Sequence, residues 1–221
     1  MKEKEKSWFL TGEEGLKAKQ SIRNENYVSR FFLRPKEEAK IVFVDDGGFF
    51  CWVHQLQING SWNNWATCTR DFAPCKICEK IPTDPQRYSR RYGEYFTIID
   101  TREITLRNGD KINNRKCLLR ATGPAIDRLA DLKSKHGSLS GLVFTVKRYT
   151  STESACGSSF DYEGKTDIGK KFGEEFTKPI DYATVLAPPT QEELNRLGLN
   201  SGIIVGSSED IGKDKEDIDL F

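Results

Sequence analysis

Four residues in the first half of the chain have the side chains and the spacing of a metal site. They follow the pattern H-x13-C-x6-C-x2-C and are His54, Cys68, Cys75 and Cys78. The two-residue gap between Cys75 and Cys78 lets one tight turn direct two thiolates at a single ion. Three thiolates and one imidazole form a closed tetrahedral set, which favours zinc and leaves no position for a substrate. The pattern therefore predicts one structural Zn²⁺.

Cys51 competes with His54 for the fourth ligand position. The two residues are three apart, so they point to opposite faces of an unbulged strand. His54 lies closer to the end of that strand, where the chain leads into the three cysteines. We therefore favour His54 as the ligand and expect Cys51 in the core, with Cys51 as the alternative. Cys117 and Cys156 stand alone and are expected to be ordinary core or surface thiols.

The enzyme signature nearest to this pattern is that of the zinc nucleobase deaminases, H-x-E followed by P-C-x-x-C. Pro74 precedes the Cys75–Cys78 pair and so matches the second half. The first half fails, because Gln55 and Leu56 follow His54 and the glutamate that moves protons is missing. Cys68 would also occupy the position that an activated water needs. The sequence therefore predicts a protein that is not an enzyme.

The elements around the metal ligands indicate a mainly β (α+β) protein. Strand patterns cover residues 28–33, 40–44, 49–58, 95–100 and 142–149, and a hairpin joins 104–106 to 112–119 through Asn108-Gly109. Helices are expected from Pro124 to about residue 135 and over 190–197, the second with a capping box. In 49–58 the even positions form an apolar face that is expected to be core. Residues 150–178 are expected to be a loop.

These elements predict an OB-type five-stranded barrel over residues 27–198. An irregular, zinc-binding subdomain is inserted at about 54–93, where Asn, Gly, Pro and Cys replace the strand pattern. Residues 1–26 are expected to form an N-terminal arm. Residues 199–221 are expected to form a flexible acidic tail that is disordered in isolation.

Charge is balanced over the whole chain but divided along it. The sequence has 34 basic and 33 acidic residues, and residues 207–221 carry six acidic residues against two lysines. The tail therefore has a net charge of −4 and the remaining body +5, which indicates a polyanionic partner for the body. No apolar run is long enough to span a membrane, and the charged N-terminus does not resemble a secretory signal.

The basic excess is concentrated in residues 70–120, which hold twelve basic and seven acidic residues. Aromatic residues are interleaved with these cations, and this combination suits a single-stranded nucleic acid, whose bases stack on rings while its phosphates follow the cations. Duplex DNA hides those base faces. The predicted DNA-binding residues are Trp62, Trp65, Arg70, Lys76, Arg87, Tyr88, Arg90, Arg91, Tyr92, Arg107, Lys111 and Arg115.

The C-terminus combines acidic residues with a final apolar pair. Asp217 and Asp219 can dock electrostatically on a partner, after which Leu220 and Phe221 can insert into an apolar pocket. The tail is therefore predicted to bind a protein partner. Its charge also allows it to compete with nucleic acid for the basic body.

Taken together, these residues resemble the zinc-containing single-stranded DNA-binding proteins of tailed bacteriophages. The resemblance rests on their order along the chain: a strand with His54, then the three cysteines, a basic aromatic stretch into residues 95–100, the Val185-Leu186-Ala187-Pro188-Pro189 segment and an acidic end. It implies an OB barrel with a zinc subdomain, and a protein that coats single-stranded DNA without strong sequence preference during phage replication, recombination and repair.

The resemblance also implies the partners and the location. The acidic tail would recruit phage replication or recombination proteins, and the protein would act in the cytoplasm of the bacterial host. An N-terminal basic motif for cooperative binding is not evident, since Lys17, Lys19 and Arg23 are scattered. A zinc-dependent RNA-binding or transcription factor using the same surface is the alternative, which the 2′-hydroxyl would distinguish.

Deletion of residues 207–221 should tighten binding to single-stranded oligo-dT, because a competing net charge of −4 is removed. Fluorescence anisotropy with a labelled oligonucleotide, at matched ionic strength, measures the change. An unchanged affinity would show that the tail does not compete for the nucleic-acid surface.

Overall fold

The computed structural model describes residues 28–58, 61–105, 109, 111–196 and 198–199, and it is mainly β, as predicted. Its few helices are short, apart from one of thirteen residues. The strands of the main sheet are β1 (Ser29–Arg30), β2 (Glu37–Phe43), β3 (Phe49–Ile58), β4 (Ser61–Thr67), β5 (Arg90–Asp100), β8 (Arg115–Ala121), β9 (Leu142–Arg148) and β10 (Ser159–Lys165). A small hairpin, β6 (Ile104–Thr105) and β7 (Lys111–Ile112), forms a separate sheet.

The main sheet is mixed and open. Its strand order is β1-β8-β5-β2-β9-β10, with β3 added to β5 and β4 added to β3. The β1–β8 pairing is parallel and the other pairings are antiparallel. In the described part of the chain, β10 pairs only with β9, and β1 contributes only two residues. Among the described residues the sheet is therefore not a closed barrel, which corrects that part of the prediction.

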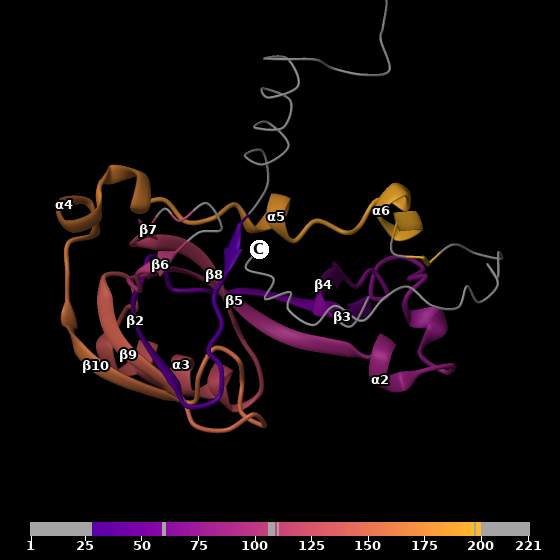
Figure 1. Ribbon diagram of the computed structural model, residues 1–221, viewed down its shortest axis with the longest axis horizontal. Helices are drawn as coiled ribbons and strands as arrows, with labels where there is room; N and C mark the ends of the chain where they lie inside the picture. Colours follow the sequence, from indigo (N-terminus) through magenta and orange to yellow (C-terminus); the bar gives the residue numbers. More distant parts are fainter. Residues whose placement is uncertain (1–27, 59–60, 106–108, 110, 197, 200–221) are drawn as a thin grey trace, which may run out of the picture.

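The main core lies between the concave face of the sheet and helix α3 (Pro124–His136) (Figure 1). Pro124 starts the helix, and Gly137, with φ of 78°, ends it in the left-handed conformation that glycine favours. Leu129 of α3 packs among rings of the sheet. Phe43 contacts Phe144 edge-to-face at 5.7 Å between ring centroids, a geometry that aromatic pairs favour.

A second layer covers the opposite face of the sheet. It is the strap, which we define as residues 166–196 and 198–199, and it contains α4 (Ile168–Phe172), η2 (Glu174–Phe176), α5 (Tyr182–Val185) and α6 (Gln191–Arg196) (Figure 1). Tyr182 anchors it, since its hydroxyl donates to Asp45 Oδ2 at 2.5 Å. Because both faces are covered, the second half of β5 is fully buried.

The prediction of a loop over residues 150–178 is wrong, because this range contains β10 and α4.

The prediction for the faces of β3 is only partly right. On the even face, His54 and Leu56 are buried as predicted, but Phe50 and Trp52 are 44% and 36% exposed. The first half of the odd face packs as well: Val53 is 1% exposed and Phe49 stacks on Tyr182 of the strap. Both faces of 49–58 are largely apolar, so the pattern could not identify which one a distant segment would cover.

The insert between β3 and β5 is more regular than its composition indicates. It contains β4, a 3-10 turn η1 (Cys78–Lys80) and the short helix α2 (Pro85–Tyr88), and β5 begins at Arg90 instead of residue 95. The predicted capping box of α6 is present, with Thr190 Oγ1 accepting from the Glu193 amide at 3.2 Å. None of the helices in the described ranges is long and apolar enough to cross a bilayer.

Replacing Phe144 by alanine should lower the free energy of unfolding by about 3–5 kcal/mol, because the ring is completely buried between the sheet and α3 and would leave a cavity. Chemical denaturation monitored by circular dichroism measures this. The matched control is Tyr149→Ala, whose side chain is 55% exposed, with an expected change within about 0.5 kcal/mol. A small loss at Phe144 would contradict this description of the core.

Candidate metal centre and adjacent cleft

The four predicted ligands converge at one point in the structure. The Nε2 atom of His54 and the three cysteine Sγ atoms all lie within 4.8 Å of one another. His54 lies on β3 and Cys68 follows β4 directly. Cys75 and Cys78 lie in the segment between Cys68 and α2. His54, Cys68 and Cys75 are buried and Cys78 is half-buried. The structure therefore contains a cluster that could hold a metal ion.

The distances within the cluster fit a tetrahedral ion. Zn–S and Zn–N bonds of about 2.3 and 2.1 Å place tetrahedral donors roughly 3.6–3.8 Å apart. The Sγ atom of Cys78 lies 3.5 Å from Cys68 Sγ and 3.5 Å from His54 Nε2, and Cys75 Sγ lies 3.9 Å from Cys68 Sγ. Three sulfurs and one nitrogen at these separations match the donor set that zinc prefers.

His54 is held in the tautomer that a metal ligand needs. Its Nδ1–H donates to the backbone carbonyl of Tyr88 at 2.8 Å, which leaves the Nε2 lone pair directed at the cysteines. Cys51 lies on the opposite face of β3, as strand alternation predicts, and packs near Tyr95 outside the cluster. Burial raises the pKa of the Cys51 thiol, so this side chain is neutral.

The electrostatics of the cluster call for a cation. Burial alone would raise the pKa of Cys75, but the contact with His54 and hydrogen bonds with the backbone of Cys78 and Ile77 lower it to about 5. Burial, a hydrogen bond with Cys68 and the charge of Cys75 raise the pKa of Cys78 to about 12. One thiolate thus prevents the next from ionising. A divalent ion would remove this conflict and allow all three thiols to ionise.

A small apolar core surrounds the cluster and joins the insert to the strap. Leu56, Ala66 and Ile77 pack around the cysteines, together with Leu199 and the partly buried Leu194 from the end of the strap. The strap is also tied to β4, because Thr67 Oγ1 donates to the Leu186 carbonyl at 2.8 Å. The insert therefore depends on contacts with a segment more than 100 residues away along the chain.

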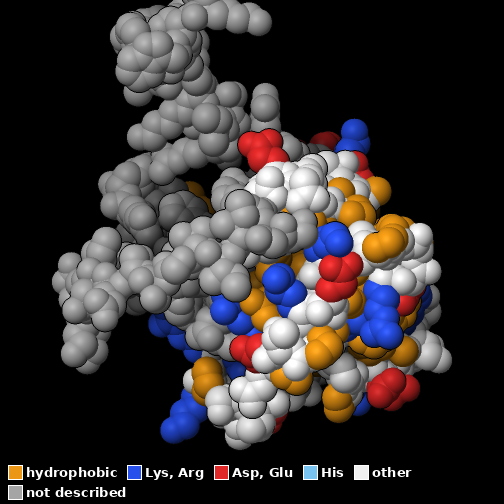
Figure 2. Space-filling model, turned by 90° about the vertical axis from the view of Figure 1, so that its right-hand side faces the viewer, with side chains coloured by type: hydrophobic (Ala, Val, Ile, Leu, Met, Phe, Trp, Pro, Cys, Tyr) orange, Lys and Arg blue, Asp and Glu red, His pale blue; other side chains and the backbone are white. Residues whose placement is uncertain are grey.

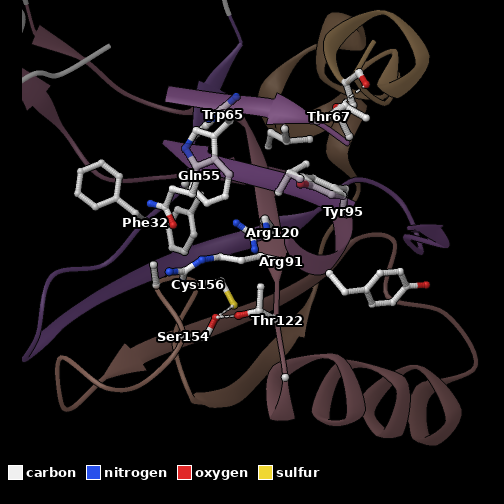
Figure 3. Close-up of a pocket in the computed structure, with 18 of the residues that line it drawn as sticks. Phe32, Gln55, Trp65, Thr67, Arg91, Tyr95, Arg120, Thr122, Ser154 and Cys156 are labelled. Atoms are coloured by element: carbon white, nitrogen blue, oxygen red, sulfur yellow. Dashed lines mark hydrogen bonds between the residues drawn. The ribbon is translucent and has the colours of Figure 1, made fainter. Parts of the chain in front are cut away.

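A cleft of about 1170 Å³ lies between the insert, the N-terminal ends of β5 and α3, and the loop 149–158 (Figure 3). Its walls combine rings with arginines. Trp65 of β4 projects over the cleft, Phe32 borders it with 42% of its surface exposed, and Arg91 and Arg120 lie between them. The strap adds Leu186 to the wall. The other charged lining residues are Arg30, Arg148, Glu153 and Glu193.

Two of these arginines, Arg91 and Arg120, have no acidic partner among the described residues. The Arg120 guanidinium stacks on Trp65 at 4.3 Å, and its Nε atom is buried without a hydrogen-bond partner in the described part of the chain. Burial, together with the charge of Arg91, lowers the pKa of Arg120. The lining carboxylates are engaged locally: Glu153 accepts from the Tyr149 amide and Glu193 from the Thr190 amide. The cleft is therefore suited to an anion.

Gly93 of β5 makes room for Arg120. A Cβ atom at this position would lie 2.7 Å from Arg120 Nε and 3.1 Å from the Ala121 carbonyl oxygen. The side chain of Arg120 can cross β5 only because position 93 has none. A glycine inside a strand is a known sign of such close approach, and this signal could have pointed to Arg120 from the sequence.

The structure gathers part of the predicted nucleic-acid set in the cleft. Trp65, Arg91 and Tyr92 line it. Arg90 lies over Trp52 on the other face of the sheet, and Tyr88 is half-buried against the core of the insert. Sequence analysis missed Arg30, Phe32 and Arg120, which line the same cleft.

The other predicted contacts lie elsewhere or already have partners. Arg115 pairs with the buried Asp100 at 3.0 Å, and Lys111 pairs with Glu103 on the small hairpin. Arg70, Lys76 and Arg87 are exposed on the insert, with Lys76 paired to Glu79. Arg107, the side chain of Trp62 and the tail residues Asp217, Asp219, Leu220 and Phe221 lie outside what the structure describes.

No protein-family model matches this sequence, and no curated protein matches it either.

Purified protein should contain one zinc per chain, and Cys68→Ser should lose it, because a tetrahedral site with one ligand missing binds weakly. Elemental analysis measures the content. The variant should also melt at least about 6 °C lower, since each kcal/mol lost shifts the Tm of a domain this large by about 2–4 °C. Cys51→Ser is the control and should retain zinc. Loss of metal in Cys51→Ser but not in Cys68→Ser would contradict the ligand assignment.

Proposed function

We propose that this protein binds single-stranded DNA in the cleft, without strong sequence preference and without catalysis. The observation that carries the proposal is the pair of arginines, Arg91 and Arg120, that lie without an acidic partner beside Trp65 in the described part of the chain. Cations next to an accessible ring are the two elements that a single strand requires, since phosphates bind the former and bases stack on the latter.

The partial burial of Arg120 strengthens the interaction that we expect between its side chain and a phosphate. The buried Nε–H of Arg120 lacks an acceptor among the described residues, and a phosphate oxygen would relieve this unfavourable state through a charge-assisted hydrogen bond. Phe32, at the border of the cleft, offers a second exposed ring. A duplex presents phosphates but no free base faces, so the rings favour a single strand.

The rim of the cleft agrees with this assignment. On the side of the molecule where the insert lies, lysine and arginine side chains are scattered among hydrophobic and acidic ones (Figure 2). Arg148 contributes indirectly: its guanidinium donates to the carbonyls of Leu33 and Ser151 and so fixes the loop 149–158 at the rim. This rim is therefore built in advance of binding.

The strand order supports an OB-type arrangement, which is part of the proposal. Five strands follow the spatial order β8-β5-β2-β9-β10, with α3 between the third and fourth of them along the chain. OB folds are partly open Greek-key barrels that bind oligonucleotides on the face of strands 2 and 3 and at the loops 1–2 and 4–5. Here these are β5 and β8, the insert, and the loop 149–158, which together line the cleft.

The metal, proposed to be zinc, would serve as a structural ion. With four protein ligands it has no position left for a substrate, and its effect would be to fix β4, and so Trp65, at the edge of the cleft. The resemblance to the phage proteins supports a role in coating single-stranded DNA during phage replication, recombination and repair in the bacterial host. The acidic tail, with Leu220 and Phe221 at its end, is proposed to bind replication or recombination proteins.

Arg91→Gln and Arg120→Gln should each weaken binding to a labelled oligo-dT about tenfold or more, because each removes a charge-assisted contact worth about 1.5–3 kcal/mol. Anisotropy titrations over a range of salt concentrations measure this, and the slope of log K against log salt should decrease by about 0.7 for each lost phosphate contact. Arg128→Gln, which removes an exposed charge from α3, is the control and should bind as the parent protein does.

Duplex DNA and single-stranded RNA of equal length complete this experiment. Equal affinity for single strand and duplex would contradict the proposal. Preference for RNA over DNA would assign the cleft to RNA instead. Melting curves of each variant show whether a loss of binding is a loss of fold.

A further inference from the structure

A second aromatic surface lies on the sheet face opposite the cleft. We call it the outer patch and define it as Phe50 and Trp52 of β3 and Tyr92 of β5. These rings are 44%, 36% and 43% exposed. Trp52 and Tyr92 are direct cross-strand partners with centroids 5.0 Å apart, and Tyr92 stacks on Phe50 at 5.8 Å with planes 14° apart. Together they form one continuous apolar surface.

Strand alternation separates the outer patch from most of the cleft. On β5, Arg91 and Tyr95 face the cleft side, where Val53 of β3 is buried, whereas Tyr92 faces the other way. None of the outer-patch rings belongs to a buried cluster of the described residues. Three contiguous exposed rings mark an interaction site more often than an accident of packing.

The outer patch and the cleft meet at an unpaired edge of β5. The pairing of β5 with β8 starts at Glu94, opposite Ala121, so residues 90–93 pair only with β3 in the described part of the chain. Arg91 lies on one side of this edge and Tyr92 on the other. Tyr92 also borders the cleft. A ligand that leaves the cleft beside Arg91 therefore meets Tyr92, which is the next residue of β5 and the first ring of the outer patch.

A cation accompanies the rings here too. The Arg90 guanidinium lies 4.5 Å from the centre of the Trp52 ring, and Asp71 of the insert holds it in place at 2.6 Å. Its Nε atom is buried without a hydrogen-bond partner among the described residues. The outer patch thus repeats the composition of the cleft, an arginine stacked on a tryptophan beside further exposed rings.

We infer that single-stranded DNA continues from the cleft around the β5 edge onto the outer patch, where Tyr92, Phe50 and Trp52 stack two or more additional bases. The inference rests on the proposed function of the cleft. It commits to nucleic acid as the occupant because the outer patch is continuous with the cleft and carries the same pairing of arginine and ring. It predicts a binding site longer than the cleft alone can hold.

The test compares oligo-dT of roughly 5 and roughly 12 nucleotides, lengths within the range of a single OB fold. The variant is the double substitution Phe50→Leu and Trp52→Leu, which keeps apolar volume but removes the ring faces. Its affinity for the longer strand should fall about tenfold or more, while its affinity for the short strand stays as in the parent protein. Phe72→Leu, which removes a ring that is 70% exposed on the insert, is the matched control and should change neither.

The outcomes separate the inference from the proposed function. If the parent protein shows no preference for single strands, the proposed function fails. If it does show one and the double variant binds both lengths like the parent, the inference is overturned and the cleft assignment stands. An equal loss at both lengths would also overturn it, since the rings would then belong to the primary site. The inference would also be overturned if the double variant bound DNA normally but changed its oligomeric state in sedimentation. That result would assign the outer patch to contact with a second copy of the chain.

Zinc content and melting temperature are measured for the double variant, because Trp52 is two residues from His54. If this variant is unstable, Phe50→Leu alone, which is further from the metal ligands, serves in its place with the same expected dependence on length.

Discussion

The backbone pairing of β5 is the constraint on which the rest of the structure depends. This single strand of eleven residues is hydrogen-bonded to β8 on one side and to both β3 and β2 on the other. Its second half is the centre of the body, with both faces buried. Its first half extends into the insert, and there alternate side chains reach two different surfaces. A register shift of one residue would exchange Arg91 and Tyr92 between those surfaces.

The metal cluster could be predicted from the sequence because its determinants are local. All four ligands fall within 25 residues, and the choice between His54 and Cys51 needed only the alternation of one strand. The helices α3 and α6 were likewise marked by residues at their own ends, Pro124 and the Thr190–Glu193 capping box. The mainly β class followed from short apolar runs separated by turns. In each case the information lay within about one element of the feature.

The remaining features depend on residues far apart in the chain, and periodicity does not report on these. The strap decides which face of β3 is buried, because Tyr182 and Leu186 cover Phe49 and Val53 while Phe50 and Trp52 stay exposed. Arg120 belongs to an apolar strand, and only its passage over Gly93 brings it beneath Trp65. The open sheet also depends on a long-range fact, namely that β10 pairs only with β9 among the described residues. None of these follows from a window of ten or fifteen residues.

The different ranges of these contacts imply an order of assembly during synthesis. The four ligands are complete once residue 78 has emerged, so the chain can capture a metal while most of it is still unmade. The cleft needs partners from Phe32 to Leu186, and the apolar shell of the insert needs Leu199. Long-range contacts form late because the intervening chain must first be ordered. A nascent chain could therefore bind a metal ion at this cluster before the cleft forms.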